Sequence, residues 1–413
     1  MSLVEPRARE TAAARRWLSI VGIGEDGVDG LTPIARSLVQ AAEIVFGGQR
    51  HLTLAAPLIR GAARPWRSPF EEAIEEVLAQ RSRDVCVLAS GDPFVYGVGS
   101  VLLRHVDPRE TVAVPAPSTF SLAAARLGWA LPETTQLSLH ARSLDLIRPH
   151  LQPGRRVLAL TSDGEGPRAL ARLLSDAGFG GSRMTVLEAL GGPRERVRGT
   201  TAAGFALRDI GPLNTLAIEV EASPGARVLA RASGLPYELF EHDGQITKRE
   251  IRAITLAALS PRRGQLLWDV GAGAGSVAIE WMLADPSMRA IAIEARSDRA
   301  ARIRRNAAAF GVPGLEVIDG TAPAAFEGLA QPDAIFIGGG ATTALDAAVP
   351  ALRSGGRLVV NAVTIETEAL LMTCRAKLGG ELSRIAITRV EPIGSKEAWR
   401  PALPVIQWAW IKP

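Results

Sequence analysis

A short apolar run, a glycine-rich turn and a helical segment follow one another without a break in the second half of this chain. Residues 266–275 read Leu-Leu-Trp-Asp-Val-Gly-Ala-Gly-Ala-Gly, and a helix is expected at 276–283. Glycines permit a tight turn and a close approach of the backbone to a ligand, and such a turn between strand and helix is typical of nucleotide-binding α/β folds. The pattern therefore predicts a Rossmann-like α/β domain with a ligand at the end of this strand.

The residues around the turn indicate the kind of ligand. In dinucleotide-binding folds this turn has the sequence pattern G-x-G-x-x-G, and a pyrophosphate binds at the helix N-terminus. Here Asp269 precedes the glycines, and its carboxylate would repel a pyrophosphate but suits the sulfonium and amino groups of S-adenosylmethionine. Glu294 ends the next expected strand and can accept hydrogen bonds from ribose hydroxyls. Gly320 and Ala322 follow the third strand, where the adenine edge is expected.

The rest of the chain follows the same alternation of strands and helices. Its 413 residues predict two domains, which we place at 17–222 and 241–413 with a linker at 223–240. A helix is expected at 248–259 with Thr247 as its N-cap. The expected strands are 17–22, 44–46, 84–89, 112–114, 156–161, 183–187, 216–221, 265–270, 290–294, 315–318, 333–337 and 357–361.

Composition narrows the classes of protein to which this chain can belong. Only two cysteines, Cys86 and Cys374, occur, each in an apolar stretch, which predicts buried thiols and a cytoplasmic location. The five histidines are nowhere paired at ligand spacing, so no metal site is expected. No apolar run has the length of a membrane span, and segment 1–16 is expected to be a mobile tail rather than a secretory signal. Arginine greatly outnumbers lysine, which fits either a GC-rich genome or an anionic ligand such as a polycarboxylate or RNA.

A second glycine motif lies near the N-terminus. Residues 21–27 read Val-Gly-Ile-Gly-Glu-Asp-Gly and formally match the dinucleotide pattern. Glu25 and Asp26 would place two negative charges where a pyrophosphate sits, and helical periodicity begins only after Pro33. We therefore reject a dinucleotide site here.

Several motifs of the first half together resemble the tetrapyrrole methylase family. They are the 21–32 loop, Phe-Gly-Gly-Gln-Arg-His at 46–51, Ala-Ser-Gly-Asp-Pro-Phe-Val-Tyr-Gly at 89–97, Pro-Ala-Pro-Ser-Thr-Phe-Ser at 115–121 and Leu-Ser-Leu-His-Ala-Arg at 137–142. The second half, with Glu-His-Asp-Gly-Gln-Ile-Thr-Lys-Arg-Glu at 241–250 and the glycine turn, resembles decarboxylating precorrin methyltransferase domains. Joined in this order, the halves resemble the decarboxylating precorrin-6Y C5,15-methyltransferase family of cobalamin biosynthesis.

The resemblance implies two S-adenosylmethionine sites. In the first half, the family's cofactor-contacting positions match Gly91, Asp92, Pro93, Val95, Tyr96, Gly97, Ser118 and Thr119. In the second half they match Thr247, Gly271, Ala272, Gly273, Ala274, Gly275, Glu294 and Ala322, to which the strand pattern adds Asp269 and Gly320. The 22–27 loop matches the loop that faces the tetrapyrrole, and 139–142 and 161–164 match the far edge of the same cleft. Ala272 stands where relatives often carry Cys.

The implied reaction is methylation of precorrin-6B at C5 by the first domain and at C15 by the second, which also removes the ring C acetate carboxyl, giving precorrin-8. No catalytic residue is predicted. We expect Lys248, Arg249 and Arg400 to bind substrate carboxylates, with solvated surface charges as the alternative for each.

An S-adenosylmethionine-dependent RNA methyltransferase is the alternative function. RNA-binding proteins usually add aromatic platforms or long basic runs, whereas the basic pairs here are short and the aromatic residues scattered. A ligand sensor without catalytic activity is a further alternative, which the intact binding elements of both halves disfavour. We expect a small-molecule tetrapyrrole substrate, no nucleic-acid or membrane partner, and a homo-oligomer.

Overall fold

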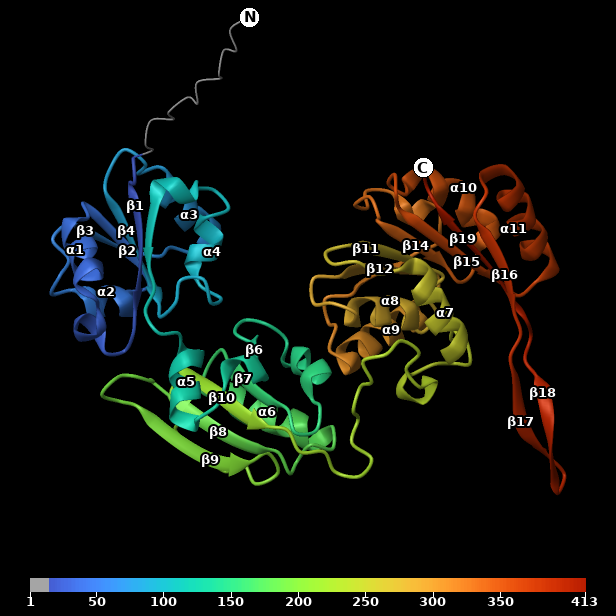
Figure 1. Ribbon diagram of the computed structural model, residues 1–413, viewed down its shortest axis with the longest axis horizontal. Coiled ribbons are helices and arrows are strands. Elements are labelled where there is room, and N and C mark those ends of the chain that lie inside the picture. The colour runs from blue at the N-terminus through green and yellow to red at the C-terminus, as the bar shows by residue number, and fades with distance from the viewer. Residues whose placement is uncertain (1–14) are drawn as a thin grey trace, which may run out of the picture. The chain divides into compact units, whose positions relative to one another are not determined.

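The computed structural model describes residues 15–413 and divides into two compact units (Figure 1). The first unit runs to Arg142 and resumes at Pro153–Ala226, and the second comprises Ser143–Gln152 and Arg227–Pro413. Most of the predicted N-terminal tail lies outside the described residues.

The first lobe of the first unit is an all-parallel sheet in the order β3-β2-β4-β1-β5. Its strands are β1 (Leu18–Ile23), β2 (Ile44–Gly47), β3 (Ala62–Pro65), β4 (Val85–Ser90) and β5 (Thr111–Val114). Its helices are α1 (Pro33–Ala41), α2 (Gln49–Ala55), α3 (Phe70–Leu78) and α4 (Val98–Leu102). Because the central strands are buried on both faces, they read as continuous apolar runs.

The second lobe is a mixed sheet in the order β6-β7-β10-β8-β9, in which only β6 and β7 pair in parallel. Its strands are β6 (Thr134–Ser138), β7 (Arg156–Leu160), β8 (Arg183–Glu188), β9 (Arg196–Thr201) and β10 (Asn214–Glu219). Helices α5 (Thr119–Leu127) and α6 (Gly166–Asp176) belong to it. Ser118 caps α5 because its hydroxyl accepts a hydrogen bond from the backbone N–H of Ser121.

The second unit has a seven-stranded sheet in the order β13-β12-β11-β14-β15-β19-β16, parallel except at β19. Its strands are β11 (Leu266–Val270), β12 (Arg289–Glu294), β13 (Glu316–Asp319), β14 (Ala334–Ile337), β15 (Arg357–Ala362), β16 (Glu381–Ile385) and β19 (Val405–Ile411). Its helices are α7 (Arg249–Leu259), α8 (Ser276–Leu283), α9 (Ser297–Phe310), α10 (Ala341–Ala351) and α11 (Ile365–Leu378). One apolar core lies on each face of the sheet, so the predicted Rossmann-like fold is confirmed.

Two strands of the second unit stand apart from this sheet. β17 (Thr388–Ile393) and β18 (Lys396–Pro401) form an antiparallel hairpin that projects from the unit (Figure 1, red). Ile393 and Trp399 on it are 64% and 73% exposed. Between residues 15 and 413, no helix is both long and apolar enough to cross a membrane.

Four features differ from the sequence-based expectations. Thr247 is not the N-cap of α7, since Lys248 occupies that position and the Thr247 carbonyl accepts a hydrogen bond from Arg252. The expected linker is packed for much of its length, because Leu229, Leu235 and Phe240 lie in the core of the second unit. A short stretch of the first half, the 3₁₀ helix η4 (Leu144–His150), also packs against α9. Strands β3, β6, β9 and β16 to β19 were not expected.

Candidate active sites

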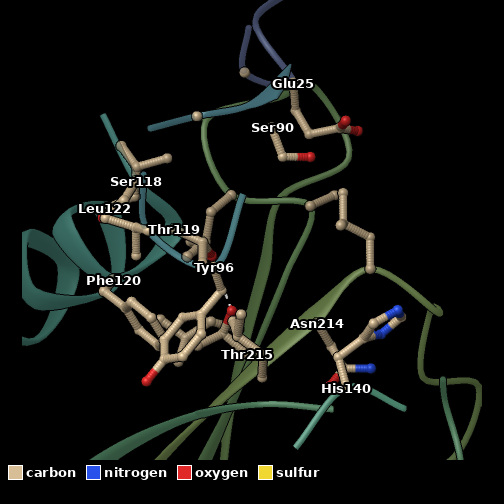
Figure 2. A pocket seen from close by; sticks show the side chains of 18 of the residues that line it. Glu25, Ser90, Tyr96, Ser118, Thr119, Phe120, Leu122, His140, Asn214 and Thr215 are labelled. Atoms are coloured by element: carbon tan, nitrogen blue, oxygen red, sulfur yellow. Dashed lines mark hydrogen bonds between the residues drawn. The ribbon is translucent and has the colours of Figure 1, made fainter. Parts of the chain in front are cut away.

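A cavity of about 320 Å³ opens at the carboxyl ends of the first-lobe strands and is closed by loops of the second lobe (Figure 2). Ligands of parallel α/β sheets bind at this end of the strands. Six of the eight predicted cofactor-binding residues line it: Gly91, Val95, Tyr96, Gly97, Ser118 and Thr119.

Two glycines allow the end of β1 and the loops beside this cavity to lie in direct contact. A Cβ on Gly22 would lie 1.9 Å from the carbonyl oxygen of Gly91, and a Cβ on Gly91 would lie 2.7 Å from that of Pro117. Gly91 also has φ of +52°, which favours glycine. The backbone itself therefore forms this wall of the cavity.

A hydrogen bond beside the same cavity joins the two lobes. The Tyr96 hydroxyl of the first lobe donates to the Gln136 backbone carbonyl of the second at 3.1 Å. Within the second lobe, the Thr119 and Thr215 hydroxyls lie 2.8 Å apart (Figure 2). Asp92 and Pro93 do not line the cavity. Asp92 instead accepts a hydrogen bond from the backbone N–H of Phe94, so it shapes the turn.

A polar cluster borders the cavity at its other end. The Arg50 guanidinium pairs with Glu25 and donates to Ser90 at 2.7 Å and to His51 at 2.8 Å. Burial, followed by the charge of Arg50, lowers the pKa of His51 to about 4, so this imidazole is neutral near pH 7. The sequence placed Arg50 and His51 in a family motif but gave them no role, because their contacts come from separate segments of the chain: the loop after β1, α2 and the end of β4.

The second unit contains a larger cavity of about 620 Å³ at the carboxyl ends of β11, β12, β14 and β15. Both volumes fall in the range of small-molecule sites. Seven of the ten predicted cofactor-binding residues of this half line it: Thr247, Gly271, Ala272, Gly273, Glu294, Gly320 and Ala322. The substrate candidate Lys248 lines it as well.

The glycine turn has the geometry that the sequence predicts. Gly271 and Gly273 have φ of +69° and +60°, and a Cβ on Gly271 would lie 2.8 Å from the Gly339 carbonyl oxygen. Glu294 accepts hydrogen bonds from the backbone N–H of Gly273 at 2.8 Å and of Arg296 at 3.1 Å. These bonds hold the Glu294 carboxylate at the cavity wall.

Asp269, Ala274 and Gly275 do not line this cavity. Asp269 is 1% exposed and accepts a hydrogen bond from the Ala278 N–H at 3.0 Å. Burial, with a smaller contribution from the charge of Glu294, raises the pKa of Asp269 to about 7. The Asp269 carboxyl is thus buried beside the turn, bonded to the first turns of α8, and does not line the cavity; its expected contact with a cofactor stays a prediction.

The three substrate candidates have different surroundings. Lys248 lines the second cavity, and its ammonium lies 5.7 Å from the centre of the Tyr237 ring. Arg249, the first residue of α7, does not line it. Arg400 lies on the projecting hairpin, where it pairs with Glu391 at 3.4 Å. Of the three, Lys248 alone borders the cavity.

A buried amide network also reaches this cavity. Asn361, at the end of β15, lines it. Its side-chain oxygen accepts a hydrogen bond from Gln407 at 2.9 Å, and its nitrogen donates to Thr255 at 3.0 Å. The sequence analysis missed Asn361, because nothing local distinguishes it from other strand residues.

Both halves of the chain match models of known protein families. Residues 18–206 match the family model of the tetrapyrrole (corrin/porphyrin) methylases, and residues 238–412 match that of the precorrin methyltransferase domain. A precorrin-6Y C(5,15)-methyltransferase [decarboxylating] of Sinorhizobium sp. is 59% identical over 405 residues, which cover 98% of this chain and 98% of that protein. The chain belongs to the precorrin-6Y C5,15-methyltransferase (decarboxylating) family.

Two further relatives each match only part of this chain. A cobalt-precorrin-7 C(5)-methyltransferase of Salmonella typhimurium is 30% identical over 44% of this chain and 88% of its own length. A probable cobalt-precorrin-6B C(15)-methyltransferase (decarboxylating) of Saccharolobus solfataricus is 36% identical over 35% of this chain and 77% of its own length.

Proposed function

We propose that this chain methylates precorrin-6B at C5 and C15 and removes the ring C acetate carboxyl, with S-adenosylmethionine as methyl donor. The observation that carries the proposal is the presence of two separate cavities, each at the carboxyl ends of parallel strands and each beside a glycine turn, in a chain of this family. An RNA methyltransferase is not favoured, because the names of the relatives all refer to precorrins.

The two activities divide between the units in this proposal. The first cavity would carry out the C5 methylation, and the second the C15 methylation and the decarboxylation. Two relatives support a division, since one is named for the C5 reaction alone and the other for the C15 reaction with decarboxylation, and each matches less than half of this chain. We place the border between the functional domains near Ala226, where the second unit resumes.

In each site the cofactor would lie against backbone. Gly91, Gly97 and the Ser118-Thr119 turn would contact it in the first cavity. Gly271 to Gly273 would do so in the second, where Glu294 would accept hydrogen bonds from the ribose hydroxyls. Methyl transfer is an in-line displacement, so these residues need only align the sulfonium with the nucleophilic carbon and exclude water.

Lys248 is the substrate-binding residue that we retain from the three candidates. Its ammonium borders the cavity and makes no hydrogen bond with the described residues, so it can bind a carboxylate of the macrocycle. For Arg249 and Arg400 we infer surface roles, because neither lines the cavity.

We further propose that the protein works in the cytoplasm as a homo-oligomer, with the β17–β18 hairpin as the contact between copies. The hairpin exposes the cross-strand pair Val390 and Trp399 on one face and Ile393 on the other, and exposed apolar side chains that lie together in this way can form an association surface.

Mass spectrometry of the product tests the proposed function. Incubation of the full chain with precorrin-6B and S-adenosylmethionine should add two methyl groups and remove one carbon dioxide. Gly91→Ala should remove one methyl gain, and Gly271→Ala should remove the other methyl gain together with the carbon dioxide loss. An unchanged substrate mass would contradict the tetrapyrrole assignment.

A further inference from the structure

The two proposed reactions differ in their proton balance. In a C-methylation, the carbon forms its bond to the methyl group while the C–S bond breaks and its electron pair stays on sulfur. The hydrogen of that carbon then leaves as a proton, and its bonding pair remains in the macrocycle. In the decarboxylation, the bond to the carboxylate breaks, carbon dioxide leaves, and the carbon takes up one proton. The C5 site therefore has to remove one proton. At the C15 site, the proton released by methylation equals the proton taken up after decarboxylation.

The first cavity has four lining residues that can carry charge or titrate among those the structure describes: Glu25, Arg50, Tyr96 and His140. One carboxylate oxygen of Glu25 faces Arg50, and the other lies 3.7 Å from Arg194. Arginine has no free lone pair to accept a proton. Tyr96 donates its hydroxyl hydrogen to the Gln136 carbonyl. His140 is left as the one side chain of this group that can accept a proton.

The surroundings of His140 leave one ring nitrogen available. Its Nδ1 lies 3.4 Å from the carbonyl oxygen of Thr161, which can only accept, so Nδ1 carries the hydrogen and Nε2 has the lone pair. The adjoining backbone is fixed, since the Ala141 N–H donates to the Ser162 hydroxyl at 2.8 Å and the Leu139 N–H donates to the Leu160 carbonyl at 2.9 Å. His140 is also exposed, so a proton can pass from it to water.

The second cavity offers a contrast. Its lining residues that can carry charge, within the described chain, are Lys248, Glu294 and Arg299. Both oxygens of Glu294 accept backbone hydrogen bonds, and the other two residues are cations. Among the described residues, no imidazole lines this cavity. This agrees with the reaction proposed there, in which the methylation releases one proton and the decarboxylation consumes one.

From this difference we propose that His140 is the general base of the C5 methylation. Nε2 of His140 accepts the proton that leaves C5, while the Thr161 carbonyl keeps the ring oriented through Nδ1. The proposal rests on the proposed function and adds to it a catalytic residue for the first cavity.

The test uses the full chain, with product mass followed over time at saturating precorrin-6B. In His140→Ala the C5 methyl gain should slow by about 100-fold or more through kcat, as for loss of a general base. The C15 methyl gain and the carbon dioxide loss, which the second cavity provides, should keep their wild-type rates. Added imidazole should restore part of the C5 rate in His140→Ala but not in His140→Gln, whose side chain fills the space.

His105→Gln is the matched control, because His105 is an exposed histidine that lines neither cavity. C5 methylation by His140→Ala at the wild-type rate would overturn the assignment. A slow His140→Ala variant that imidazole does not rescue would also overturn it and would indicate a structural role. A wild-type chain without methyl gain would contradict the proposed function and this proposal with it.

Discussion

Arg252 and Glu280 form an ion pair in the interior of the second unit, with 2.6 Å between Nε and Oε1 and side chains that are 0% and 3% exposed. Glu280 also accepts the backbone N–H groups of Gly234 and Leu235, and Arg252 donates to the carbonyl of Thr247 at 2.6 Å. The pair thus joins α7 and α8 to the segment that precedes them and to the rim of the second cavity.

Glu280→Gln should lower the free energy of unfolding of this unit by about 3–5 kcal/mol, because it leaves the Arg252 charge buried without a counter-charge. Hydrogen exchange of the α7 and α8 amides would measure the loss. Arg305→Met is the control, since the Arg305–Glu241 pair is 56% exposed on both sides and such pairs contribute little. Equal protection in Glu280→Gln and wild type would contradict the prediction.

Asp269 should make the second unit less stable as pH rises. Its pKa is about 7 in the folded chain and near 3.8 in the unfolded chain. Between these values the unfolded carboxyl is ionised while the folded one is still protonated, so raising the pH favours unfolding until about pH 7. Asp269→Asn, which cannot ionise, should flatten this slope. Urea denaturation at several pH values would measure it, and parallel profiles for the two proteins would show that the prediction is wrong.

Gly271→Ala should abolish ligand binding in the second cavity alone. The new Cβ would meet the Gly339 backbone at 2.8 Å, and the residue would have to keep a positive φ. Titration calorimetry with S-adenosylhomocysteine should give two sites per wild-type chain and one per variant chain. Gly314→Ala serves as the control, because nothing lies within 4 Å of its added Cβ. Two intact sites in Gly271→Ala would contradict the role of the turn.

A fragment that begins at Arg227 should be more stable than one that begins at Glu241. The shorter fragment lacks Leu229, Leu235 and Phe240, and Phe240 stacks on Phe310 with ring centres 4.2 Å apart. Each buried side chain of this kind contributes about 1.5–3 kcal/mol. Thermal unfolding followed by circular dichroism compares the two. Similar midpoints would mean that this segment is dispensable.

Replacing the exposed apolar residues of the hairpin should dissociate the proposed oligomer. Ile393→Ser with Trp399→Ser removes its two most exposed large apolar side chains, and light scattering should then report the mass of one chain. Ile365→Ser, on α11, changes a residue that is 82% exposed but outside the hairpin, so it should leave the mass of the wild type. A wild-type mass for the hairpin variant would remove the hairpin as the contact.

The sequence predicted best what depends on local chemistry. The central strands were predicted because strands buried on both faces need continuous apolar runs. The glycine turn was predicted because Gly271, Gly273 and Gly275, at alternate positions, all have positive φ, which glycine adopts readily. The resemblance to tetrapyrrole methylases and precorrin methyltransferases was confirmed by the family models.

What the sequence could not predict depends on partners distant along the chain. β9 and the β17–β18 hairpin are largely exposed, so they lack an apolar pattern. The burial of Asp269 was not predicted, because its position in the motif does not show which way the carboxyl points. His140 could be given a role only once the other titratable side chains of the cavity were known to be engaged.

The packing of residues 143–152 with the second unit has a topological consequence. The chain passes from one unit to the other after Arg142, returns after Gln152, and passes again after Ala226. Cleavage of the peptide bond at any one of these three places leaves two crossings between the units intact. After a cut at the last crossing, the first unit is still held by the 143–152 segment, which packs in the second unit. Limited proteolysis of this protein would therefore yield nicked chains that co-purify, and gel filtration alone would not reveal that they had been cut.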